Sequence, residues 1–83
     1  MDEVVSLRKR IDAIDSAIAA LVAARAETVE HIRAVKLREG LPPVDESRES
    51  IVVSRLEASL LGIAEPALVA RKLADVLLRR GTV

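Results

Sequence analysis

The chain has 83 residues, 51% of them hydrophobic, and its 13 basic and 13 acidic side chains give a formal net charge of zero. It has no Cys, Phe, Tyr or Trp and a single His. These values predict one folded domain over residues 1–83, and they exclude a disordered tail, a disulfide framework and a Cys- or His-cluster metal site.

The composition also limits which classes of partner the chain is expected to bind. A neutral chain without aromatic residues lacks the basic surface and the stacking platforms that nucleic-acid binding uses. No apolar run approaches the roughly 18 to 20 residues of a membrane span, and the acidic start, residues 1–3, is unlike a signal peptide. We therefore expect a cytoplasmic protein with neither a membrane nor a nucleic-acid partner. Because a chain this short buries only about 60% of its unfolded surface alone, an oligomer is expected to complete the core.

The first predicted element is a long helix over residues 4–38. This stretch has no Pro or Gly, and Gly40 and Pro42-Pro43 end it. Its length would be roughly 50 Å, whereas a compact domain of this size has a radius of gyration near 12 Å. Such a rod is expected to need a partner along its whole length. Its apolar residues recur at helical, nearly heptad spacing: Val4, Leu7, Ile11, Ile14, Ile18, Leu21, Val29, Ile32 and Val35.

Two shorter helices are predicted after it. Asp45 is a good N-cap, so the second helix starts there or one residue later, and Gly62 marks its end. Pro66 fits the first turn of a third helix that stops at Gly81. No strand-like alternation occurs, so the predicted fold class is all-α, with one long helix and two short ones.

Two cations interrupt the apolar stripe of the long helix. Arg25 lies within the stripe, and Lys36 follows it three turns later on nearly the same face. A buried cation costs several kcal/mol unless an anion meets it, and Glu27 and Glu30 occupy other faces of the helix. An anion from outside the chain is one interpretation. A snorkelling side chain or an interhelical ion pair is the other.

Further polar residues complete the candidate set. Asp45, Arg48 and Glu49 share one helical face, either as a capped start with a local ion pair or as a polar wall that grips a carboxylate and accepts hydroxyl hydrogens. Arg8 lies 17 residues before Arg25, about 25 Å along one helix. It can share a site with Arg25 only if another chain supplies it, as in an antiparallel pair of long helices.

Taken together, LRKRIDAID (7–15), LVAAR (21–25), Lys36 and DESRE (45–49) resemble the all-helical (AroQ-type) chorismate mutases over nearly the whole chain. The resemblance implies an intertwined homodimer of three-helix chains with two equivalent sites. Each site would rearrange chorismate to prephenate without a metal or cofactor. The reaction is a one-step pericyclic shift, which requires a compact dianion held still and positive charge near the breaking C–O bond.

The resemblance also assigns roles to the cations. Arg25 would hold one substrate carboxylate, Arg48 would serve the other carboxylate region, and Arg8 would come from the second subunit. Lys36 would donate a hydrogen bond to the ether oxygen and to a carboxylate. The acids at Asp45 and Glu49 would surround the ring hydroxyl, and the catalytic set would be Lys36, Arg25 and Glu49.

One feature departs from many relatives, which place a Gln late in the third helix. This chain has no Gln, so either Arg79 or Arg80 replaces that contact or the site is incomplete in this chain alone. The short tail, residues 77–83, resembles a small actinobacterial subclass that is activated in complex with DAHP synthase, which makes that enzyme a hypothetical partner.

Three alternatives stay open on sequence grounds. A 4-amino-4-deoxychorismate mutase of the same fold would present its two acids to an amine. Isochorismate-pyruvate lyases are similar too, but Glu49 directly after Arg48 favours a mutase. A non-catalytic helical dimer module would instead satisfy Arg25 and Lys36 with acids of the protein.

Overall fold

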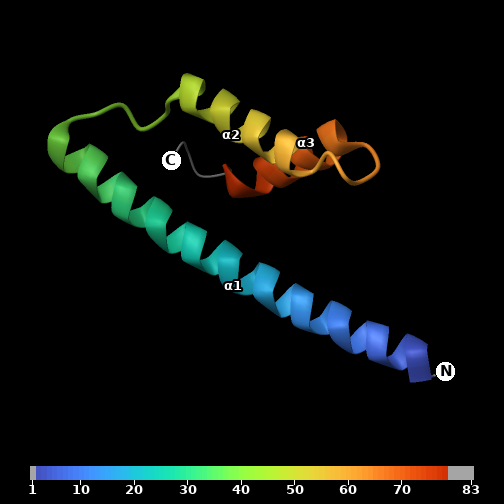
Figure 1. Ribbon diagram of the computed structural model, residues 1–83. Helices are drawn as coiled ribbons and strands as arrows, with labels where there is room; N and C mark the ends of the chain where they lie inside the picture. Colours follow the sequence, from blue (N-terminus) through green and yellow to red (C-terminus); the bar gives the residue numbers. More distant parts are fainter. Residues whose placement is uncertain (1, 79–83) are drawn as a thin grey trace.

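The computed structural model describes residues 2–78, and these form three α-helices (Figure 1). They are α1 (Asp2–Glu39), α2 (Glu46–Ser59) and α3 (Pro66–Leu77). No strand occurs within residues 2–78, so the all-α prediction is confirmed, and α1 spans the whole of the predicted first helix. The predicted end of the third helix at Gly81 lies outside the described residues.

The long helix α1 sets the length of the molecule. Its 38 residues span about 57 Å at 1.5 Å per residue, and the molecule measures 58 × 24 × 15 Å. The radius of gyration is 16.2 Å, above the roughly 12 Å of a compact chain of this size. Figure 1 shows α1 running away from α2 and α3 toward its N-terminal end. The predicted rod is therefore present, and the main packing between helices is that of α2 on α3.

A Schellman motif ends α1. Gly40 has a φ of 70°, in the left-handed region that glycine adopts without strain. The Leu41 N–H donates to the Lys36 carbonyl at 2.8 Å, and the Gly40 N–H donates to the Leu37 carbonyl at 3.4 Å. The predicted stop at Gly40 thus has a local cause, and the same motif fixes the backbone at Lys36.

The two short helices begin as the sequence predicts. The Asp45 side chain caps α2, and Pro66 occupies the first turn of α3. Helix α2 ends at Ser59, earlier than the predicted Gly62, because its last turn tightens. There the Leu60 N–H donates to both the Leu56 and Glu57 carbonyls, at 3.1 Å each.

The core is small and lies between α2 and α3, which pack side by side (Figure 1). It consists of Val52, Ala70 and Ala74, with exposed fractions of 7%, 0% and 3%. Helix α1 has no buried residue. The apolar side chains along its first half stay about half exposed: Leu7, Ile11, Ile14 and Ile18. None of the described helices is both long enough and apolar enough to cross a membrane.

Candidate active site

Arg25 of α1 meets the end of α3, and its charge interacts with the charge of Arg48 on α2. Arg25 is partly buried, and its Nη1 donates a hydrogen bond of 2.8 Å to the Leu77 carbonyl at the end of α3. Burial lowers the pKa of Arg25, and the positive charge of Arg48 lowers it further. Arg25 therefore has a carbonyl partner within its own chain, whereas one interpretation of the sequence placed its partner outside. Two positive charges that interact in this way repel each other, so an anion that binds both is favoured.

Lys36 lies one helical turn before the end of α1 and faces the loop that follows. Its Nζ donates to the Pro43 carbonyl at 3.4 Å, which is long for a hydrogen bond. Lys36 and Asp45 line one hollow of about 470 Å³, formed by the end of α1, the loop and the start of α2. The ammonium group thus lies beside space that a small ligand could occupy. The other lining residues are Leu41, Pro42, Val44, Glu46 and Ser47.

Asp45 has a structural role as well as a place in this hollow. Its Oδ1 accepts a hydrogen bond of 3.1 Å from the Arg48 backbone N–H, and its carbonyl accepts one of 3.0 Å from the Glu49 N–H. Asp45 therefore orients the first turn of α2, which carries both Arg48 and Glu49. An ionised carboxylate offers about four acceptor sites, so the cap leaves capacity for a ligand hydroxyl.

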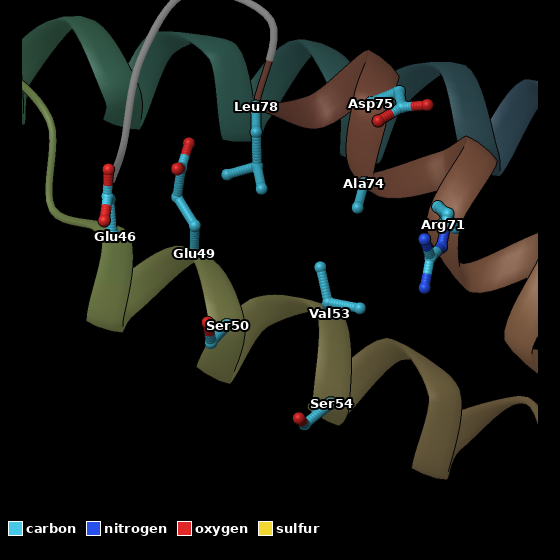
Figure 2. A pocket seen from close by; sticks show the side chains of 9 residues that line it. All are labelled: Glu46, Glu49, Ser50, Val53, Ser54, Arg71, Ala74, Asp75 and Leu78. Atoms are coloured by element: carbon cyan, nitrogen blue, oxygen red, sulfur yellow. The ribbon is translucent and has the colours of Figure 1, made fainter.

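Glu49 lines a second hollow, a groove of about 810 Å³ between α2 and α3 (Figure 2). Its side chain extends from α2 toward Leu78. Three more ionisable residues line this groove, namely Glu46, Arg71 and Asp75. Glu46 lines both hollows and thus connects them.

Sequence reasoning did not identify Glu46, Arg71 or Asp75 as candidates. A signal was present, since Arg71 and Asp75 are four residues apart and Glu46 is three residues before Glu49, spacings that place each pair on one helical face. Without knowledge that α2 and α3 pack together, neither pair could be assigned to a shared groove.

The described chain does not bring all the predicted site residues together, since Glu49 lines a different hollow from Lys36 and Asp45, and Arg8 lies apart from both. Arg8 is exposed on the first half of α1, about 25 Å from Arg25 along the helix axis. The structure therefore places Lys36 with Asp45 in one hollow and Glu49 in the other, links Arg25 to Arg48 through their charges, and leaves Arg8 apart. Arg79 and Arg80, one of the two alternatives for the late Gln, lie outside the described residues.

Residues 7–79 match the family model described as chorismate mutase type II. No curated protein and no solved structure matches the chain. The family match covers all three helices and every candidate residue from Arg8 to Glu49. It confirms the resemblance seen in the sequence, and the chain belongs to the chorismate mutase type II family.

Proposed function

We propose that the protein is a chorismate mutase that rearranges chorismate to prephenate. Family membership supports mutase-type chemistry, and the observation that carries the specific proposal is the partly buried guanidinium of Arg25, which the Leu77 carbonyl holds and which the positive charge of Arg48 also affects. Chorismate is a dianion, and guanidinium groups bind carboxylates through paired N–H donors. Two arginines from different helices therefore suit a substrate with two carboxylates.

In this proposal Lys36 stabilises the transition state. As the substrate's C–O bond breaks and a C–C bond forms, negative charge gathers on the ether oxygen. A preorganised donor at such an atom contributes about 3 to 4 kcal/mol, and holding the reacting ends together contributes roughly 7 to 11 kcal/mol in favourable cases. The long bond from Lys36 to the Pro43 carbonyl is a contact that Nζ can exchange for the substrate.

The two acids are proposed to contact the substituent on the substrate ring. Glu49 extends into the groove between α2 and α3, and Asp45 keeps acceptor capacity beyond its capping bond. Carboxylates accept hydrogen bonds from a hydroxyl and also from an amine, so 4-amino-4-deoxychorismate is the substrate to compare.

A homodimer is proposed to complete the site, with Arg8 donated by the partner. Helix α1 runs away from α2 and α3 toward its N-terminal end, and its Ile11, Ile14 and Ile18 side chains are 51–53% exposed. Burying such a stripe contributes about 25 cal/mol per Å² of apolar area. Antiparallel pairing of two α1 helices would place Arg8 of one chain near Arg25 of the other.

Mixed dimers test the shared site. Arg8→Ala and Arg25→Ala homodimers should each be strongly impaired. A mixture of the two variants should regain activity, because one of the two sites in each heterodimer then has both arginines. The two variants are unfolded and refolded together to form mixed dimers, and each variant refolded alone is the control. A mixture no more active than its components would contradict the donation of Arg8 across subunits.

A turnover assay tests the function itself. Purified protein should convert chorismate to prephenate faster than it converts the 4-amino analogue, and Arg48→Ala should lose most of that activity. Faster conversion of the analogue would identify the alternative mutase, and pyruvate release from isochorismate would identify a lyase. A helical dimer that neither turned over these compounds nor bound a bicyclic transition-state analogue would be a non-catalytic module.

Two further expectations belong to the proposal, a complex with DAHP synthase and a cytoplasmic location. Addition of DAHP synthase should raise turnover of chorismate, and an unchanged rate would exclude an activating complex. Fractionation of cells with an antibody against the protein would test the location.

A further inference from the structure

The end of α3 holds Arg25 in place. Arg25 Nη1 and the Leu77 carbonyl are 2.8 Å apart, although the two residues are separated by 52 positions in the chain. The last carbonyls of a helix have no intrahelical partner and carry partial negative charge. Leu77 is the final residue of α3, so Arg25 supplies one of these carbonyls with a charged donor.

This bond constrains the whole guanidinium group. A guanidinium carries five N–H donors in a rigid planar fork, so fixing one of them, together with the attachment of the side chain to α1, restricts the directions of the rest. The neighbouring charge of Arg48 repels Arg25, and the partial negative charge of the Leu77 carbonyl opposes that repulsion. The carbonyl therefore holds Arg25 in place when no anion is bound.

The carbonyl itself has a fixed position. The Leu78 N–H, in the same peptide group as the Leu77 carbonyl, donates to the Ala74 carbonyl at 2.8 Å. Ala74 and Ala70 are buried where α3 packs against α2, with exposed fractions of 3% and 0%. A continuous set of contacts thus links the α2–α3 core to the guanidinium of Arg25.

We propose that the backbone carbonyl of Leu77 is a positioning group that orients Arg25 for the substrate carboxylate, so that the end of α3 controls substrate affinity through Arg25. The inference rests on the proposed function, in which Arg25 binds a carboxylate. It assigns a role in substrate binding to a backbone atom of a helix whose side chains carry none of the predicted site residues.

The test uses a substitution that changes the orientation of the Leu77 carbonyl and leaves the Arg25 side chain unaltered. Leu78→Pro removes the N–H that bonds to Ala74, and proline disfavours helical geometry at the residue before it. Leu78→Ala is the matched baseline, because it shortens the same side chain and keeps the peptide N–H. Each variant is made with Arg25 and with Arg25→Ala, in the full-length protein. The readouts are kcat and KM for chorismate and the Kd of a bicyclic dicarboxylate transition-state analogue.

With Arg25 present, Leu78→Pro should weaken analogue binding about tenfold relative to Leu78→Ala, mainly through KM in the kinetic assay. In the Arg25→Ala background the same change should alter the Kd by less than about twofold, because the residue it acts through is gone. Equal effects in the two backgrounds would show a merely structural role and would overturn the proposal. Failure of the unmodified protein to bind the analogue would overturn the proposed function and this inference together.

A second measurement covers the case in which Leu78→Pro does not fold. In protein labelled with ¹³C at the leucine carbonyls, Arg25→Ala should shift the Leu77 carbonyl resonance. Arg38→Ala, which removes an exposed cation from the same helix, should leave that resonance in place. A Leu77 resonance unmoved by Arg25→Ala would overturn the contact, independently of any activity.

Discussion

The two roles of Asp45 can be separated by substitution. Its Oδ1 caps α2 through the Arg48 N–H, and its carboxylate is proposed to bind the substrate. Asp45→Asn keeps an oxygen that can accept the capping bond, since Asn and Asp are comparable N-caps. Asp45→Ala removes both the cap and the charge. Both variants lose the interaction of the carboxylate with the helix dipole, worth about 0.3 to 1 kcal/mol.

The difference between the variants isolates the cap. Asp45→Ala should be about 1 kcal/mol less stable than Asp45→Asn, which lowers Tm by about 4 to 8 °C in a domain of this size. Thermal unfolding followed by circular dichroism measures this difference. Turnover of chorismate, assayed well below both Tm values, should fall in both variants if the charge contacts the substrate. Equal Tm values would refute the capping argument, and full activity of Asp45→Asn would refute a role for the negative charge.

Three more predictions concern the site, the dimer and the core. Lys36→Ala should lower kcat for chorismate by at least about a hundredfold, and a near-normal rate would remove Lys36 from the mechanism. Ile14→Asp should dissociate the proposed dimer, as measured by sedimentation velocity. Ala13→Asp, which lies on another face of α1, should leave the dimer intact. If both variants stayed dimeric, the proposed interface along the α1 stripe would be refuted. Ala70→Leu should overpack the α2–α3 core and destabilise the protein by about 1 to 3 kcal/mol in chemical denaturation, and an unchanged midpoint would show that the site can expand.

Elements with local causes were predictable from the sequence. The end of α1 follows from Gly40, whose positive φ closes a Schellman motif, and the start of α2 follows from the Asp45 cap. Both depend on residues within a few positions of each other. The end of α2 was predicted too late, because the tightened turn at Leu60 stops the helix before Gly62 is reached.

Contacts between distant segments were not predictable in the same way. Alanines fit any face of a helix, so the pattern did not single out Ala70 and Ala74 as the buried contact of α3. The bond from Arg25 to the Leu77 carbonyl joins a side chain to a backbone atom, and no residue type at position 77 signals it. The sequence pattern identifies Arg25 as a charged residue within an apolar stripe, but it does not predict the hydrogen-bond partner of Arg25.

In the proposed homodimer, pairing of the chains and completion of the site would depend on the same part of α1. The first half of this helix carries both the exposed apolar stripe and Arg8, whereas the second half carries Arg25, which is bonded to the end of α3, and Lys36, which lies beside the loop. A small core of one valine and two alanines gives a single chain little apolar burial, so pairing of the α1 stripes would supply stability as well as the missing arginine. An unpaired chain would then lack both. This arrangement would couple catalytic competence to assembly, since no stable single chain would carry a complete set of substrate-binding cations.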